Sequence, residues 1–227
     1  MKIKRVDDYL KKAIFYLRES KKYFYFTFIL FILFILIGYF FPVFFQEKIL
    51  SMIKEILNET QNLGVFSLIR YIFINNLMSS FSSLFLGIFL GIFSFISLII
   101  NSYVLGFVMN KSVLSEGIFV LWRLLPHGIF EIPALIISIS LGLKLGLSLI
   151  YNCIKEYKMN IYLFMILSFL FFPIAFIVSL FFTLNNKKLY KKLKYNFLNS
   201  FNIFIFIIIP LLVIAAIIEG LLIYLLN

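Results

Sequence analysis

Three charged side chains lie inside the long apolar stretches of this chain, and they are the first candidates for chemistry: Glu131, Lys144 and Glu219. A carboxylate in an apolar surrounding can bind a cation or relay protons, and an ammonium group can pair with it. Ionisable side chains are costly in lipid unless they have partners. Each of the three therefore marks either a functional group or a fixed contact between helices.

Glu131 belongs to a motif that reads Leu-Pro-His-Gly-Ile-Phe-Glu-Ile-Pro-Ala and holds the only histidine, His127. Pro126 has a fixed φ and no N–H, so it suits the start of a helix, and Pro133 falls within or near the first turns. His127, Gly128 and Glu131 are therefore predicted at the start of a membrane-spanning helix. They either cap and lock this helix end or carry a function, and the pattern alone leaves both interpretations open.

Composition places the chain in a bilayer. Hydrophobic residues make up 63% of the 227 residues and charged residues 14%, whereas a soluble domain has about 25% charged residues. The net charge of +11 comes from cations at the ends of apolar runs, without interleaved aromatics. This pattern favours contact with anionic lipid headgroups over nucleic acid. One histidine and the single cysteine, Cys153, provide no ligand set for zinc and no intramolecular disulfide, and no cofactor is indicated.

The apolar runs predict an all-α, polytopic helical membrane protein with about five transmembrane helices. A basic amphipathic segment, residues 1–22, is expected on the cytoplasmic surface and precedes a single helical membrane domain, residues 23–227. The region 101–125 opens with Asn101-Ser102, contains a polar patch, and is expected to be a broken or re-entrant element. Residues 46–70 predict an amphipathic helix and a turn. The predicted spans cover about residues 23–45, 77–100, 124–147, 159–184 and 201–226.

Small residues recur at every fourth position in two of these spans. Such stripes let helix backbones approach closely in lipid, where packing rather than hydrophobicity drives association. The simplest prediction is that the two stripes pack against each other. They consist of Ser79, Ser83, Gly87 and Gly91 in the second span, and of Ala134, Ser138, Gly142 and Gly146 in the third.

The distribution of cations predicts the orientation of the chain. With five spans and a cytoplasmic N-terminus, fifteen of the 21 Lys and Arg residues lie inside and six outside, in line with the positive-inside rule. The C-terminus is then external, and the chain is a multi-pass protein of the cell membrane. In this arrangement Glu131 lies near the cytoplasmic end of the third span, whereas Lys144 and Glu219 lie near external ends. Lys144 and Glu219 are at a depth that allows them to pair, whereas Glu131 and Glu219 are expected to lie too far apart to act together.

The motif around Glu131, continued by Leu-Gly-Leu-Lys-Leu-Gly at 141–146, resembles the signature of the stage II sporulation protein M family, and the likeness spans roughly residues 70–224. The resemblance implies a five-span integral membrane protein. In spore-forming bacteria the namesake helps to organise a peptidoglycan-degrading complex, and many relatives come from organisms that never sporulate, archaea among them. Three further places carry the likeness: Asn75-Asn76 at the opening of an apolar helix, Asn101 and Gly106 after it, and Ala-Ala-Ile-Ile-Glu ending at Glu219.

Two classes of function remain. A non-enzymatic scaffold or recruiter would hold other membrane or cell-envelope proteins, and the resemblance favours this class. A transporter or channel for a small solute, a cation or protons would use Glu131 and Glu219 within the membrane, together with His127. An enzyme is not expected, because no phosphate loop, no Gly-x-Ser-x-Gly and no suitably spaced nucleophile and base are present. The expected partners are anionic headgroups and other membrane or envelope proteins, and a homo-oligomer remains an option.

Overall fold

The computed structural model describes residues 2–157, 160 and 172–226, with side chains for residues 11–122, 128–151, 154, 155, 160 and 173–225. Every described element is a helix, which confirms the all-α prediction. In chain order the helices are α1 (Lys2–Glu19), α2 (Lys21–Phe40), α3 (Gln46–Thr60), α4 (Val65–Phe85), η1 (Leu86–Ile88), α5 (Ile92–Glu116), η2 (Ile118–Leu124), α6 (Leu125–Tyr157), α8 (Phe172–Asn185), α9 (Lys187–Ile203), η3 (Phe204–Ile208) and α10 (Ile209–Leu226).

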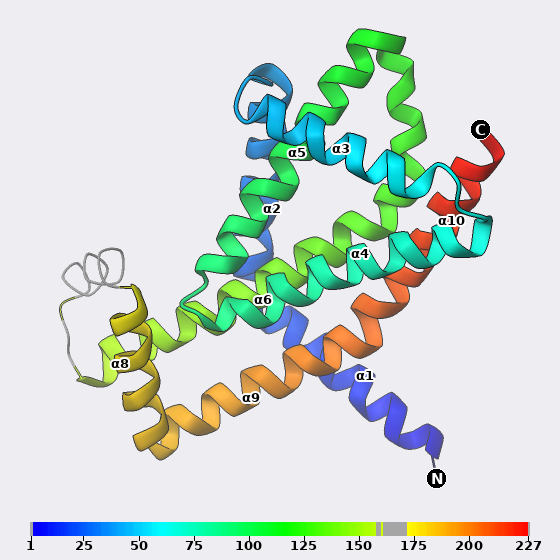
Figure 1. The fold of residues 1–227 in the computed structure, drawn as a ribbon. Coiled ribbons are helices and arrows are strands. Elements are labelled where there is room, and N and C mark those ends of the chain that lie inside the picture. Colours follow the sequence, from blue (N-terminus) through cyan, green and yellow to red (C-terminus); the bar gives the residue numbers. More distant parts are fainter. Residues whose placement is uncertain (1, 158–159, 161–171, 227) are drawn as a thin grey trace.

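Five described helices are long and apolar enough to cross a membrane, which confirms the predicted number. The span on α6 is the most buried of the five, and α2, α4, α5 and α10 all pack against this central helix (Figure 1). The five apolar stretches are Lys21–Phe40, Val65–Ile88, Ile92–Glu116, Gly128–Tyr151 and Lys187–Leu225.

The second predicted span, residues 77–100, is divided between two helices. α4 passes into the short 3-10 turn η1, and Leu90 (φ 55°) and Gly91 (φ 79°) reverse the chain before α5 begins. Glycine reaches this left-handed backbone without strain, so it suits the end of a helix. The boundary between α4 and α5 cannot be recognised in the sequence, because both helices and the turn between them are apolar and because Gly91 continues the four-residue spacing of small residues. Asn101 lies inside α5, where the helix is unbroken.

A break within the predicted region 101–125 is present at Gly117. α5 ends at Glu116, Gly117 takes a φ of 82°, and the short helix η2 leads directly into α6. α5 and α6 then run antiparallel, and Leu98 of α5 packs with Leu135 and Ile139 of α6.

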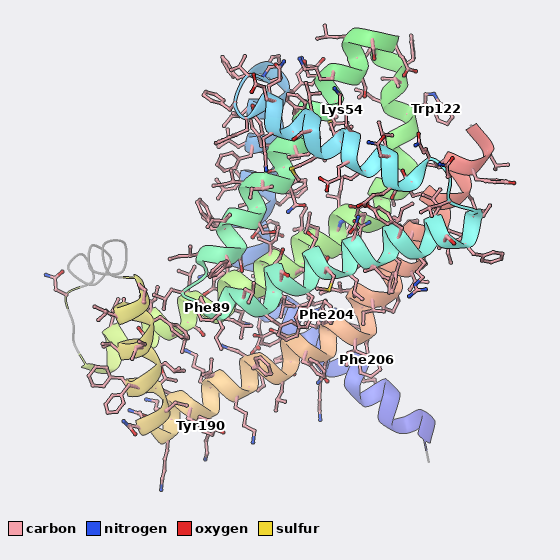
Figure 2. The ribbon with its side chains drawn as sticks, viewed as in Figure 1. Lys54, Phe89, Trp122, Tyr190, Phe204 and Phe206 are labelled. Atoms are coloured by element: carbon pink, nitrogen blue, oxygen red, sulfur yellow. The ribbon has the colours of Figure 1, made fainter. Side chains whose placement is uncertain are left out.

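The C-terminal part of the fold differs in length from the predicted spans. The predicted span 159–184 lies largely outside the described residues, and its described end forms α8, which has 14 residues. α9 continues through the π-helix η3 into α10. Pro210 follows η3 closely and has no N–H to donate to a backbone carbonyl of the preceding turn. In the widened turn of η3, nearby carbonyls accept from other backbone N–H groups. Phe204 of η3 packs on Phe85 of α4 with ring centroids 5.5 Å apart (Figure 2).

The spans give the bundle two opposite ends. At one end, the α3 side, α3 packs on the second half of α5 through Ile49, Tyr103 and Phe107, and the end of α10 meets the start of α4 where Gly220 faces Ile69. At the other end, the α1 side, α1 packs against α9. Figure 1 shows α3, the end of α5 and the C-terminus in its upper part, and α1, α8 and α9 in its lower part.

This arrangement corrects the predicted placement of residues 101–125. The sequence predicts them on the side of the N-terminal segment, but the end of α5 and η2 lie on the α3 side, opposite α1. The cause is the extra crossing made by the α4–α5 hairpin. Because α4 and α5 are separate spans, α6 starts on the α3 side and ends on the α1 side, the reverse of the predicted direction.

Candidate functional site

Glu131 and Glu219 come together near the α3 side of the bundle. Glu131 lies in the second turn of α6 and Glu219 near the end of α10, and their carboxylates interact electrostatically. The side chain of Asn76 on α4 donates a hydrogen bond to the Glu131 carboxylate. The three residues reach a similar depth because α4 and α6 run parallel while α10 runs antiparallel to both.

The prediction that the two glutamates are too far apart is therefore wrong. It placed Glu131 at the cytoplasmic end of its span because it counted two crossings before that span, whereas the fold has three, on α2, α4 and α5. With the direction of α6 reversed, the start of α6 and the end of α10 share one end of the bundle.

The carboxylate pair formed by Glu131 and Glu219 has a hydrogen-bond acceptor that the described residues do not use. The Oε2 atom of Glu219 is buried and has no hydrogen-bond partner among the described residues. Two negative charges in a region of low dielectric repel each other strongly, and a proton or monovalent cation between them would offset that repulsion. In the described part of the chain, no three His, Cys, Asp or Glu side chains gather as a metal site would require. The arrangement is suited to a single positive charge.

A groove reaches Glu131 from the side of the bundle. It has a volume of about 760 Å³ and lies between α2, α5, η2 and α6. Its lining is apolar apart from Glu131, Asn101 and the indole of Trp122, and it also includes Gly128 and Pro133 of the motif. Trp122 projects outward from η2 (Figure 2), and Phe119 and Ile129 of the lining are exposed as well. The groove is therefore an apolar surface that contains a carboxylate.

Asn101 is fixed by hydrogen bonds within the α4–α5 hairpin. Its Nδ2 donates to the backbone oxygen of Ser97 at 2.8 Å and to the Ser97 hydroxyl at 3.1 Å. The Ser97 hydroxyl is hydrogen-bonded to Ser83 of α4 at 2.5 Å, and Ser94 donates to the Ser83 backbone oxygen at 2.6 Å. Ser94 and Ser97 were not among the residues predicted from the sequence. Their signal was the i, i+3 spacing of two serines in an apolar run that ends four residues later at Asn101.

The two small-residue stripes lie in contact along α4, η1 and α6. A Cβ atom on Gly87 would lie 2.5 Å from the Cα of Gly142, and one on Gly146 would collide with backbone atoms of Gly87 and Gly91. Bare backbones thus touch at this crossing, and no side chain larger than hydrogen fits there.

The serine hydroxyls of the two stripes donate hydrogen bonds within their own helices. The hydroxyl of Ser83 donates to the backbone oxygen of Ser79 at 2.6 Å, and that of Ser138 donates to the backbone oxygen of Ala134 at 2.9 Å. Ala134 and Ser138 are fully buried. Neither hydroxyl donates to the facing stripe on the other helix, so the close contact between the stripes depends on the glycines.

The remaining predicted residues are Asn75, Pro126 and His127. Asn75 is exposed on α4 and its side chain hydrogen-bonds Tyr71 rather than Glu131. Pro126 and His127 lie in the first turn of α6, and their side chains fall outside the described part of the structure, as does that of Cys153.

Lys144 does not pair with Glu219, although their predicted depths allowed such a pair. Lys144 lies toward the α1 side, where its Nζ donates to the Ser20 hydroxyl at 2.8 Å and lies 3.6 Å from the centroid of the Tyr16 ring. Burial raises the pKa of Tyr16 well above its usual value, so this ring stays neutral beneath the ammonium group. The reversed direction of α6 is again the reason. Tyr16 lies in the last turn of α1 and Ser20 joins α1 to α2, and this four-residue spacing was not used in the prediction.

Fold and site together define a multi-pass α-helical membrane protein whose polar side chains gather at helix contacts. The family model of Stage II sporulation protein M matches residues 27–222, and the chain belongs to this family. The match confirms the resemblance and extends it toward the N-terminus, over α2 and α3. No curated protein and no solved structure matches the chain.

Proposed function

We propose that this protein is a non-enzymatic membrane scaffold that recruits other membrane or envelope proteins through the groove between α2, α5, η2 and α6. One observation carries the proposal: Glu131 and Asn101 lie in a groove that is otherwise apolar and whose rim side chains are exposed. A carboxylate facing lipid tails is unfavourable. A partner helix with a hydrogen-bond donor at that depth would satisfy it and cover the exposed rim.

The orientation that suits this role has α1 in the cytoplasm and the groove toward the external half of the membrane. Fourteen described Lys and Arg residues lie on the α1 side and five on the α3 side, leaving aside Lys144 within a span and Lys158 outside the described residues. This asymmetry follows the positive-inside rule although the spans differ from those predicted. The C-terminus would be external, and the cell membrane is the compartment proposed.

Photo-crosslinking in the native membrane tests the recruitment role. A photoreactive residue at Ile129, on the groove, should give a discrete adduct with one protein, whereas the same residue at Phe66, which is exposed at the start of α4, should give only lipid adducts. Glu131→Leu should abolish the Ile129 adduct while the protein remains in the membrane. If Ile129 yields only lipid adducts, the groove does not recruit a protein.

A second candidate function is a proton or cation pathway, and the unpartnered Oε2 of Glu219 beside Glu131 favours it specifically. Purified protein in vesicles loaded with a pH-sensitive dye would be given a proton gradient, and then gradients of Na⁺ or K⁺. This function requires flux that is lost in both Glu131→Gln and Glu219→Gln while the folded protein is retained. Wild-type vesicles no leakier than protein-free vesicles would exclude it.

A further inference from the structure

The turn that joins α2 to α3, residues 41–45, exposes a cluster of large apolar side chains. Four of its five residues are more than half exposed, and the most exposed is Phe45 at 78%. The four are Phe41, Val43, Phe44 and Phe45. Exposed apolar side chains that adjoin one another mark a contact with lipid or with another protein.

This turn has a defined backbone conformation. The Tyr103 hydroxyl of α5 donates to the backbone oxygen of Phe41 at 2.8 Å and accepts from the backbone N–H of Phe44 at 3.0 Å. Phe45 has a φ of 56°, in the left-handed region that bulky side chains rarely adopt. Such strain persists where the surroundings offset it. Because the Phe45 side chain is largely exposed, burial within the protein does not offset this strain, whereas burial in an apolar phase outside the protein would.

The length of α2 places the turn at a boundary of the membrane. α2 has 20 residues, Lys21–Phe40, and is therefore about 30 Å long, the thickness of the hydrocarbon core. Two lysines at the start of α2 mark one boundary, and no charged residue follows them until Glu47. The exposed apolar surface of α2, which includes Leu36 and Phe40, thus continues into the turn without an intervening charge.

α3 follows the turn as an amphipathic helix that crosses the end of the bundle (Figure 1). The first part of its apolar face packs on α5 through Ile49 and Ile53. The same face continues with Ile56 and Leu57, which are exposed, and the opposite face is polar and includes Asn58. A helix with this pattern lies in the plane of the membrane interface, with its apolar face toward the acyl chains.

The charges of α3 favour apolar insertion over attraction to headgroups. The helix carries three glutamates and two lysines, a net charge of −1, so anionic lipids would not attract it. We propose that the aromatic turn 41–45 and the exposed apolar face of α3 at Ile56 and Leu57 insert into the lipid interface on the α3 side. The burial of apolar side chains holds them there. This contact is separate from the groove proposed to recruit proteins.

Tryptophan fluorescence of the full-length protein in phosphatidylcholine nanodiscs tests the insertion. Trp122 is the only tryptophan, so Trp122→Phe gives a background without tryptophan emission. In this background, Phe45→Trp and Ile56→Trp should show blue-shifted emission that aqueous iodide does not quench. Lipids brominated in the acyl chain close to the carbonyl should remove most of this emission. Bromine near the methyl end should quench less, because an interfacial helix enters only the outer part of the acyl region.

Asn58→Trp is the matched control for Ile56→Trp. Two positions along a helix correspond to a rotation of about 200°, so the two probes face opposite ways. The Asn58→Trp emission should be red-shifted, quenched by iodide and unchanged by brominated lipid. Phe41→Trp is a second probe of the turn, at a residue whose φ is −126°. It should behave like Phe45→Trp even if tryptophan disturbs the left-handed backbone at position 45.

Three outcomes would overturn the proposal. Quenching of the Phe41, Phe45 and Ile56 probes by iodide, with none by brominated lipid, would mean that the turn and α3 project into water. Protection of these probes from both quenchers would mean that a second copy of the chain covers the surface. Quenching by brominated lipid that appears only after phosphatidylglycerol is added would mean that headgroup charge, rather than apolar burial, holds α3 at the membrane.

Discussion

Gly87 and Gly142 approach so closely that a Cβ atom on Gly87 would lie 2.5 Å from the Cα of Gly142. This contact joins η1, at the turn of the α4–α5 hairpin, to the centre of α6. We expect Gly142→Ala to destabilise the protein by about 1–3 kcal/mol, the usual cost of overpacking a tight contact. Gly64→Ala is the control, since no atom lies within 4 Å of a Cβ there and its backbone is not left-handed. Thermal unfolding in detergent measures both variants, and equal stability of the two would contradict the contact.

The stripes illustrate what the sequence could predict and what it could not. Spacing of four residues predicts which small residues share a helix face, and Gly87, Gly142 and Gly146 do lie at a helix crossing. The same spacing concealed the helix boundary at Leu90 and Gly91. In a soluble protein polar residues would mark such a turn. In a membrane protein the turn can be apolar, and these six apolar residues have the same sequence pattern as a continuous helix. Because this one chain reversal was not predicted, the predicted direction of α6 was wrong, and so were the predicted relative depths of Glu131, Lys144 and Glu219.

The sidedness of the chain can be tested with single cysteines. In a Cys153→Ser background, Asn58→Cys on α3 and Ser115→Cys at the end of α5 should react with a membrane-impermeant maleimide from the same side. Lys12→Cys on α1 should react only from the other side. All three positions are exposed, so access to the reagent does not limit the labelling. If Ser115→Cys is labelled together with Lys12→Cys, α5 does not cross as described, and the direction of α6 would have to be reconsidered.

Tyr103 of α5 ties down the connection between α2 and α3. Its hydroxyl donates to the backbone oxygen of Phe41 at 2.8 Å and accepts from the backbone N–H of Phe44 at 3.0 Å. Tyr103→Phe would leave these backbone groups unpaired, at an expected cost of about 1–3 kcal/mol. Hydrogen exchange at residues 41–45 should accelerate in this variant, while Tyr25→Phe, on an exposed tyrosine of α2, should not change it. Unchanged exchange in Tyr103→Phe would show that the loop is held by other contacts.

The hydrogen bond between Asn76 and Glu131 allows a structural role of the Glu131 carboxylate to be distinguished from a role of its negative charge. Glutamine at position 131 can still accept a hydrogen bond from the Asn76 amide, so Glu131→Gln should lower the stability of the protein by less than about 1 kcal/mol. The same change removes one of the two facing negative charges. Leucine cannot accept that bond, so Glu131→Leu should cost about 1–3 kcal/mol more by leaving the Asn76 donor unpaired.

A double-mutant cycle isolates this pair. Asn76→Leu combined with Glu131→Leu should be less destabilising than the sum of the two single changes, because neither buried polar group is then left without its partner. Thermal unfolding of the four proteins in one detergent gives the coupling free energy. Additive effects would mean that Asn76 and Glu131 do not depend on each other, and the carboxylate would then have to be stabilised by Glu219 through a shared proton or cation. In that case Glu219→Gln should change the stability of the wild type but not that of Glu131→Gln.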